Sequence, residues 1–133
     1  MVKRIAKSAL SGNPGQNDAM ERTIVVSRDT VGSTGLYTSI VSTAPRGRTE
    51  IHHHGPCETS IYILSGHARF YSGDALTDIV EARAGDFVFV PAFEVHVEEN
   101  ASDADDLVVL LSRNCDGSIV HYVEGTLPAR PAS

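Results

Sequence analysis

Two histidines one residue apart, His52 and His54, and a later one, His96, are the residues in this sequence best suited to chemistry. Side chains on a β-strand alternate between its two faces, so residues two positions apart project from the same side. On a strand, His52 and His54 therefore share a target, whereas His53 points away from it. Neutral imidazoles suit iron, zinc, nickel, manganese or copper better than calcium or magnesium. We therefore predict one divalent transition-metal ion bound by His52, His54 and His96.

Strands are the elements expected to position these histidines. From Arg22 onward, short runs rich in β-branched and aromatic residues alternate with Gly, Pro, Asp and Asn, which is typical of a sandwich or barrel. The expected strands, about ten in number, are 23–27, 36–43, 49–54, 60–64, 68–71, 78–82, 87–90, 95–99, 107–112 and 119–123. Both faces of the run 87–90 are apolar, which predicts a strand that is buried on both sides or lines an apolar cavity.

The segment around the first two histidines resembles the first motif of the small single-domain cupins, G-x5-H-x-H-x3,4-E-x6-G. His52 and His54 match its histidine pair, although Gly47 lies one residue too close to them. The later segment resembles the second cupin motif, G-x5-P-x-G-x2-H-x3-N, with Phe93 where the motif has its second glycine. The residues at the other motif positions are Gly85, Pro91, His96 and Asn100.

The glutamate of the first motif has two candidate positions. Counting forward from the histidines selects Glu58, whereas counting back from the final glycine selects Thr59. Both cannot face inward in a regular strand, because a shift of one residue reverses the face. A bulge just after His54 would bring Glu58 to the metal. Without one, the site has three histidines and a water, or an unusual ligand such as Cys57.

The resemblance implies an all-β fold, the double-stranded β-helix or jelly-roll barrel of two packed antiparallel sheets. It implies a metal near one mouth of the barrel, held by His52, His54, Glu58 and His96, and it implies a homodimer. Glu98 has the same parity as His96 along the chain, which suits a residue that orients a ligand or acts as a general base. The alternative is a solvated carboxylate beside Glu99. Glu58 and Glu98 are thus the candidate catalytic residues, and we expect no organic cofactor.

Open coordination positions at such a metal would let a substrate reach it. The resemblance implies a metal-dependent enzyme acting on a small organic carbonyl, enolate or phenolate. Among the possible activities, we rank a dioxygenase-type oxidoreductase first. One alternative is a redox-neutral zinc-dependent cyclase or isomerase, such as an aromatic polyketide cyclase. Another is a non-catalytic metal or small-molecule binding module, which an inward-facing Thr59 and a closed pocket would favour.

Length, charge and cysteine content set the expected domain organisation, partners and location. The 133 residues suggest a flexible arm over 1–20, one barrel domain over 21–125 and a tail over 126–133. The formal net charge of −6 argues against nucleic acid and anionic membranes as partners, which leaves a small-molecule substrate. With two cysteines and no long apolar run, the chain is expected to be cytoplasmic.

Overall fold

The structure is a computed structural model, which describes residues 1–115 and 119–131. Its described strands are β1 (Asn13–Pro14), β2 (Met20–Val26), β3 (Tyr37–Thr43), β4 (His52–His53), β5 (Thr59–Ser65), β6 (His67–Ser72), β7 (Asp78–Arg83), β8 (Phe87–Val90), β9 (Val97–Asn100), β10 (Leu107–Arg113) and β11 (His121–Tyr122). Its described helices are one turn long: η1 (Lys7–Ala9), α1 (Arg28–Val31) and η2 (Asp74–Leu76). All ten expected strands are present, with ends that shift by a few residues.

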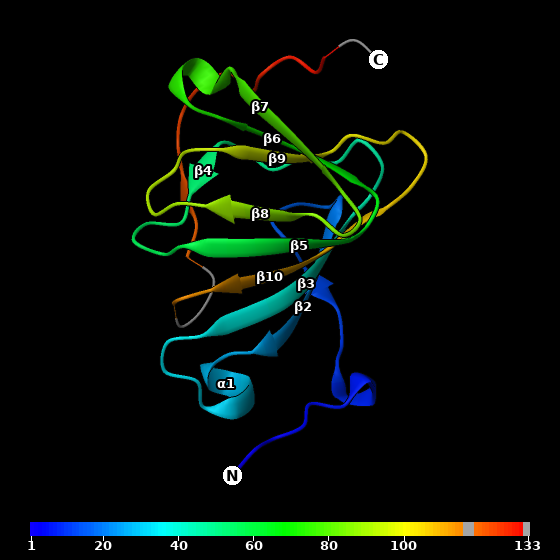
Figure 1. Ribbon diagram of the computed structural model, residues 1–133, viewed down its shortest axis with the longest axis vertical. Coiled ribbons are helices and arrows are strands. Elements are labelled where there is room, and N and C mark those ends of the chain that lie inside the picture. The colour runs from blue at the N-terminus through cyan, green and yellow to red at the C-terminus, as the bar shows by residue number, and fades with distance from the viewer. Residues whose placement is uncertain (116–118, 132–133) are drawn as a thin grey trace.

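The strands form two antiparallel layers. One sheet has the order β1-β2-β3-β10-β5-β8, and a smaller one has the order β7-β6-β9. The β11-β4 pair joins the smaller sheet through a bridge between His52 and His96, so the second layer continues from β9 to β4. Figure 1 shows β6, β7 and β9 above the strands of the larger sheet. The expected jelly-roll sandwich is confirmed.

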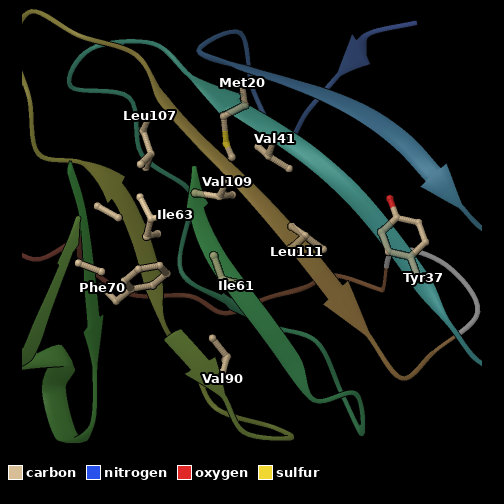
Figure 2. Packing of buried hydrophobic residues seen from close by; sticks show 12 residues of the cluster. Met20, Tyr37, Val41, Ile61, Ile63, Phe70, Val90, Leu107, Val109 and Leu111 are labelled. Atoms are coloured by element: carbon tan, nitrogen blue, oxygen red, sulfur yellow. The ribbon is translucent and has the colours of Figure 1, made fainter. Parts of the chain in front are cut away.

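Strict alternation of side chains places the core between the layers. In β3 and β10 every second residue is buried, because one face of each strand packs inward and the other does not. Figure 2 shows Phe70 of the smaller sheet in one cluster with Ile61 and Ile63 of β5 and Val109 of β10. This cluster fixes the register of the strands that reach the site.

One inward-facing row of residues closes the end of the barrel nearest the histidines. Arg113, the last residue of β10, pairs with Tyr37 on one side and with Thr59 on the other. Thr59 in turn pairs with Val90 at the end of β8. Since directly paired residues lie on the same face of a sheet, these four side chains line the same mouth.

The outer face of β8 is exposed, which differs from the prediction made for this strand. Phe87 and Phe89 are 72% and 60% exposed, whereas Val90 is buried. The prediction of a strand buried on both faces is wrong, because β8 is the edge strand of the larger sheet and no described segment of this chain covers its outer side. These two phenylalanines are therefore not core residues, although Val88, Phe89 and Val90 do line a small cavity of about 70 Å³, as the second alternative predicted.

The C-terminal segment packs against the outside of the smaller sheet. Glu99 is fully buried there, and its carboxylate is 2.7 Å from a guanidinium nitrogen of Arg69 and 3.2 Å from one of Arg130. The hydroxyl of Tyr71 donates a hydrogen bond of 2.5 Å to the same carboxylate. A buried carboxylate needs such partners, so this ion cluster holds the tail to β9, on the side opposite the barrel interior.

Cys57 and Cys115 form a disulfide, with their Cα atoms 5.7 Å apart. The expectation that Cys57 is free to act as a soft metal ligand is therefore wrong. The pairing follows from the fold, because the Thr59 to Arg113 register, extended by two residues, brings position 57 opposite position 115. Because the two cysteines are paired, they no longer support the expected cytoplasmic location, which is a reducing compartment. Among the described residues, no helix is long and apolar enough to span a membrane.

Candidate metal centre

His52, His54 and His96 lie together inside the barrel mouth. Their candidate ligand atoms are all within 4.8 Å of one another. His52 and His54 project from the same side of the β4 segment, and backbone hydrogen bonds of 3.2 and 2.9 Å between His52 and His96 hold the third histidine beside them. His53 faces the other way and stacks on the exposed ring of His121. The strand parity thus gathers these three side chains and excludes the fourth.

Backbone carbonyls select the tautomer of each ring. The Nδ1 atoms of His52, His54 and His96 lie 2.7, 2.7 and 2.9 Å from the carbonyl oxygens of Glu50, Ile119 and Glu94. A carbonyl only accepts, so each Nδ1 carries the proton and each Nε2 carries the lone pair. Three Nε2 lone pairs in one place are a donor set that fits a divalent transition ion.

Burial keeps these imidazoles neutral. Their exposed fractions are 1%, 5% and 3% for His52, His54 and His96. Burial lowers the pKa of His52 to about 3, with the neighbouring His96 adding to the effect. Burial also lowers the pKa of His54 to about 3, with help from the charge of Arg113, and it lowers the pKa of His96. At neutral pH all three are therefore ready to bind a cation without first losing a proton.

Glu58 does not join this cluster, which corrects its expected role as a ligand. Gly55 turns the chain directly after His54, with a φ of 60°, and β5 then begins in regular register at Thr59. No bulge intervenes, so Glu58 is exposed and its carboxylate accepts from Asn114 at 3.4 Å. Thr59, which is 2% exposed, faces the interior instead.

Arg113 takes the space beside Thr59. Its Nε donates to the Thr59 hydroxyl at 3.1 Å, and its Nη2 lies 3.4 Å from Nε2 of His54. The side chain is 6% exposed, and burial lowers its pKa to about 10, so it is still cationic at neutral pH. A guanidinium therefore lies beside Thr59, one of the two candidate positions for the glutamate of the first motif.

Two further polar side chains reach the barrel interior from opposite sides. Glu98 pairs with Phe70 of the core and so faces inward from β9, where burial raises its pKa to about 7 while the charge of Arg113 acts in the other direction. Gln16, on the hairpin loop before β2, places its Nε2 atom 3.5 Å from Nε2 of His52. Glu98 thus lies on the face that its parity with His96 predicts.

Arg113 and Gln16 were not among the site residues predicted from the sequence. Arg113 had a usable signal, because it continues the inward positions of Leu107, Val109 and Leu111 and is charged. No comparable signal pointed to Gln16, because this residue lies among turn-forming residues whose position depends on long-range contacts.

Comparison with known proteins places this geometry in a family. Residues 39–112, more than half of the chain, match the family described as Cupin domain. The chain belongs to the cupins. This cupin is 32% identical over 89 residues to a probable oxalate decarboxylase from Arthroderma benhamiae, a match that covers 65% of the chain and 22% of that protein. It therefore spans only about a fifth of this relative's length.

Solved structures share the fold of this cupin. The polyketide cyclase RemF from Streptomyces resistomycificus superposes with a TM-score of 0.77 at 19% identity, covering 95% of this chain and 88% of that one. A variant of the Bacillus subtilis oxalate decarboxylase OxdC gives a TM-score of 0.72 at 25% identity, covering 84% of this chain and 30% of the decarboxylase. The double-stranded β-helix fold is thereby established, and the reaction is a separate question.

Proposed function

We propose that this cupin is a metal-dependent enzyme that acts on a small organic substrate bound as an oxygen anion. The observation that carries this proposal is the convergence of the three Nε2 lone pairs of His52, His54 and His96 beside the guanidinium of Arg113. When bound, a divalent ion would supply Lewis acidity toward a substrate oxygen, and iron, nickel or copper would add reactivity toward dioxygen.

The charge balance of the site favours an anion. Its candidate ligands are neutral imidazoles, and the cation Arg113 lies 3.4 Å from Nε2 of His54. Glu98, whose carboxylate faces this interior, has its pKa raised by burial to about 7, so at neutral pH it offsets this positive charge only in part. Since Thr59 rather than a glutamate faces the site, no carboxylate from β5 offsets this positive charge. Arg113 presents a planar set of donors that matches a carboxylate or enolate. We infer that it orients the oxygen anion of the substrate.

Arg113 also borders a surface groove. This groove, of about 250 Å³, is lined by Leu36, Phe89, Thr59 and Arg113, among others. Both apolar side chains are exposed, at 51% and 60%. This groove suits a substrate with an apolar body and an anionic end that contacts Arg113.

Proton transfer is the role that we assign to Glu98. Its side chain faces the same interior as His96, and the protein supplies Arg113 as its counter-charge. We propose that this carboxylate takes a proton from the carbon adjacent to the one that bears the bound oxygen, while Arg113 and the protonated Nδ1 atoms stay fixed in position. An oxygen-dependent outcome, of the dioxygenase type, is the first form of this reaction.

A redox-neutral outcome is the second candidate, and the comparisons favour it. The structural match with the polyketide cyclase RemF covers nearly the whole of both chains, and the other relatives are oxalate decarboxylases, whose Bacillus subtilis representative has Mn(II) centres. In this form the proton transfer to Glu98 would be followed by ring closure instead of oxygen insertion. In a decarboxylation, which needs no proton abstraction from carbon, protonated Glu98 would instead donate a proton to the carbanion left when carbon dioxide departs.

A binding module without turnover is the third candidate. It is supported by the inward-facing Thr59 and by the small size, about 70 Å³, of the cavity that His96 lines with Phe70 and Val90. Such a module would bind a metal and an anion but would leave every anion chemically unchanged.

Elemental analysis of protein purified without a histidine tag tests the proposal. We expect close to one equivalent of a transition metal in the native chain and in Glu58→Ala, and a loss of that metal in His96→Ala. Full metal retention in His96→Ala would contradict the proposed centre. Substrate turnover with aromatic and aliphatic carboxylates or enols, under air and under nitrogen, then separates the three candidates.

A further inference from the structure

The hairpin before β2 brings a side-chain amide to the histidine cluster. The Nε2 atom of Gln16 lies 3.5 Å from Nε2 of His52. The carbonyl oxygen of the same amide, Oε1, is buried and has no hydrogen-bond partner. Leaving a buried polar atom unpaired is unfavourable, so an orientation of the amide that gives this oxygen a partner would be more stable.

The backbone on both sides of Gln16 is fixed by contacts. The amide of Gly15 donates to the carbonyl of Met20 at 2.9 Å, and a Cβ at Gly15 would lie 2.6 Å from that of Met20. The side chain of Asn17 donates to the carbonyl of Arg48 at 2.8 Å and accepts from the amide of Ala19 at 3.0 Å. The loop is thereby held against the chain segment that leads into β4.

The geometry suits a fourth metal ligand. A half-turn about the last side-chain bond exchanges the oxygen and nitrogen of an amide, which would place Oε1 about where Nε2 now lies. Ligand atoms around a tetrahedral ion, at about 2.0–2.1 Å from the metal, are about 3.3–3.4 Å apart. The 3.5 Å between the Gln16 amide and His52 Nε2 is close to that spacing.

We propose that Gln16 supplies, through Oε1, the fourth protein ligand of the ion bound by His52, His54 and His96. The position that the cupin motif gives to glutamate is not available for this role, because Thr59 stands there and its hydroxyl accepts from Arg113. An amide ligand leaves the full positive charge of the metal in place, which agrees with an anionic substrate. This inference rests on the proposed metal centre.

Cobalt(II) is the probe for this inference, because its visible absorption reports the number and type of its ligands. The full chain is loaded with Co²⁺, and its affinity is measured by competition with a chelator for the native protein, Gln16→Ala and Gln16→Glu. The matched control is Asn13→Ala, an exposed side chain in the same hairpin. Circular dichroism confirms that each variant is folded.

We expect Gln16→Ala to bind Co²⁺ about tenfold more weakly or worse and to have a changed visible spectrum, as for the loss of a group that supports a metal site. Gln16→Glu should keep or exceed the native affinity, and Asn13→Ala should match the native protein. Native affinity and spectrum in Gln16→Ala would overturn the inference while leaving the three-histidine centre intact. A native chain that binds no Co²⁺ would overturn both.

Discussion

The Nη2 atom of Arg113 lies 3.4 Å from the Nε2 atom of His54, one of the three candidate metal ligands. A cation this close to a metal site opposes binding of the metal by itself. An anion that contacts both would relieve the repulsion. Because coupling between two ligands is reciprocal, the metal and the anion are expected to strengthen each other's binding.

Removing the guanidinium tests this coupling. In Arg113→Met, the affinity of Co²⁺-loaded protein for formate or azide should fall about tenfold or more, since a hydrogen bond to a charged group contributes about 1.5–3 kcal/mol. Metal content should be unchanged or higher. Arg83→Met, on the exposed strand β7, is the control. The measurement is an anion titration followed by visible absorption, and equal anion affinity in both variants would refute the assignment.

Restoring the carboxylate of the cupin motif should reverse the charge preference. Thr59 faces the interior beside Arg113, so in Thr59→Glu the new carboxylate would pair with the guanidinium or the metal. We expect a higher metal affinity and a weaker response to formate. Ser60→Glu, whose side chain points outward, is the matched control. If anion affinity in Thr59→Glu equals that of Ser60→Glu, the site does not select anions through its charge.

The histidines of the candidate site were predictable because strand parity is a local property. His52 and His54 share a face whatever the rest of the chain does, and the cupin motif added His96. The choice between Glu58 and Thr59 was not predictable, because it depended on whether the turn at Gly55 contained an extra residue. A shift of one residue there reverses the face of everything that follows.

The remaining site residues depend on contacts between distant segments. Arg113 meets His54 only because β10 pairs with β5, and Gln16 meets His52 only because the hairpin loop is tied to Arg48. The buried carboxylate of Glu99 likewise needs Arg130, 31 positions along the chain. Local patterns in the sequence predicted the strands, but the order of the strands decides which side chains meet.

Acid should destabilise the metal-free protein through its buried histidines. The pKa of His52 and of His54 is about 3 in the folded chain and 6.5 when unfolded. Between pH 3 and pH 6.5 the unfolded chain binds more protons than the folded chain. The free energy of unfolding therefore decreases as the pH falls below 6.5, and these two histidines do not change it above that pH. Each histidine should cost about 2 kcal/mol between pH 7.5 and pH 5.

Urea titrations of the chelator-treated protein at these two pH values measure this loss. His54→Gln removes one of the two groups, so its stability should fall by about 2 kcal/mol less than that of the native chain over the same interval. Identical pH dependence in the two proteins would mean that His54 is not held in its neutral form by burial.

Backbone strain at Phe93 gives a prediction about stability. Phe93 has a φ of 61° at the position where the second cupin motif has glycine, and its side chain is 64% exposed. A side chain in this left-handed region is strained, whereas glycine is not. Phe93→Gly should therefore be more stable than Phe93→Ala by about 1 kcal/mol. Urea unfolding of the two variants measures the difference, and a more stable alanine variant would contradict this reasoning.

The disulfide between Cys57 and Cys115 links folding stability to the candidate metal centre. Cys57 follows the turn after His54, and Cys115 precedes Ile119, whose carbonyl accepts from Nδ1 of His54. The bridge closes a loop with a sequence separation of 58 residues, for which the chain-entropy model gives about 4 kcal/mol of stabilisation. Reduction should therefore lower stability and also loosen the backbone that orients His54.

Dithiothreitol should lower the urea midpoint of the native protein and speed the removal of Co²⁺ by a chelator. The double variant Cys57→Ser with Cys115→Ser should have the lower midpoint from the start and should not respond to the reductant. If the native midpoint drops while the cobalt release rate stays the same, the bridge stabilises the fold without positioning His54. An unchanged midpoint would show that the two cysteines are not bonded in the isolated protein.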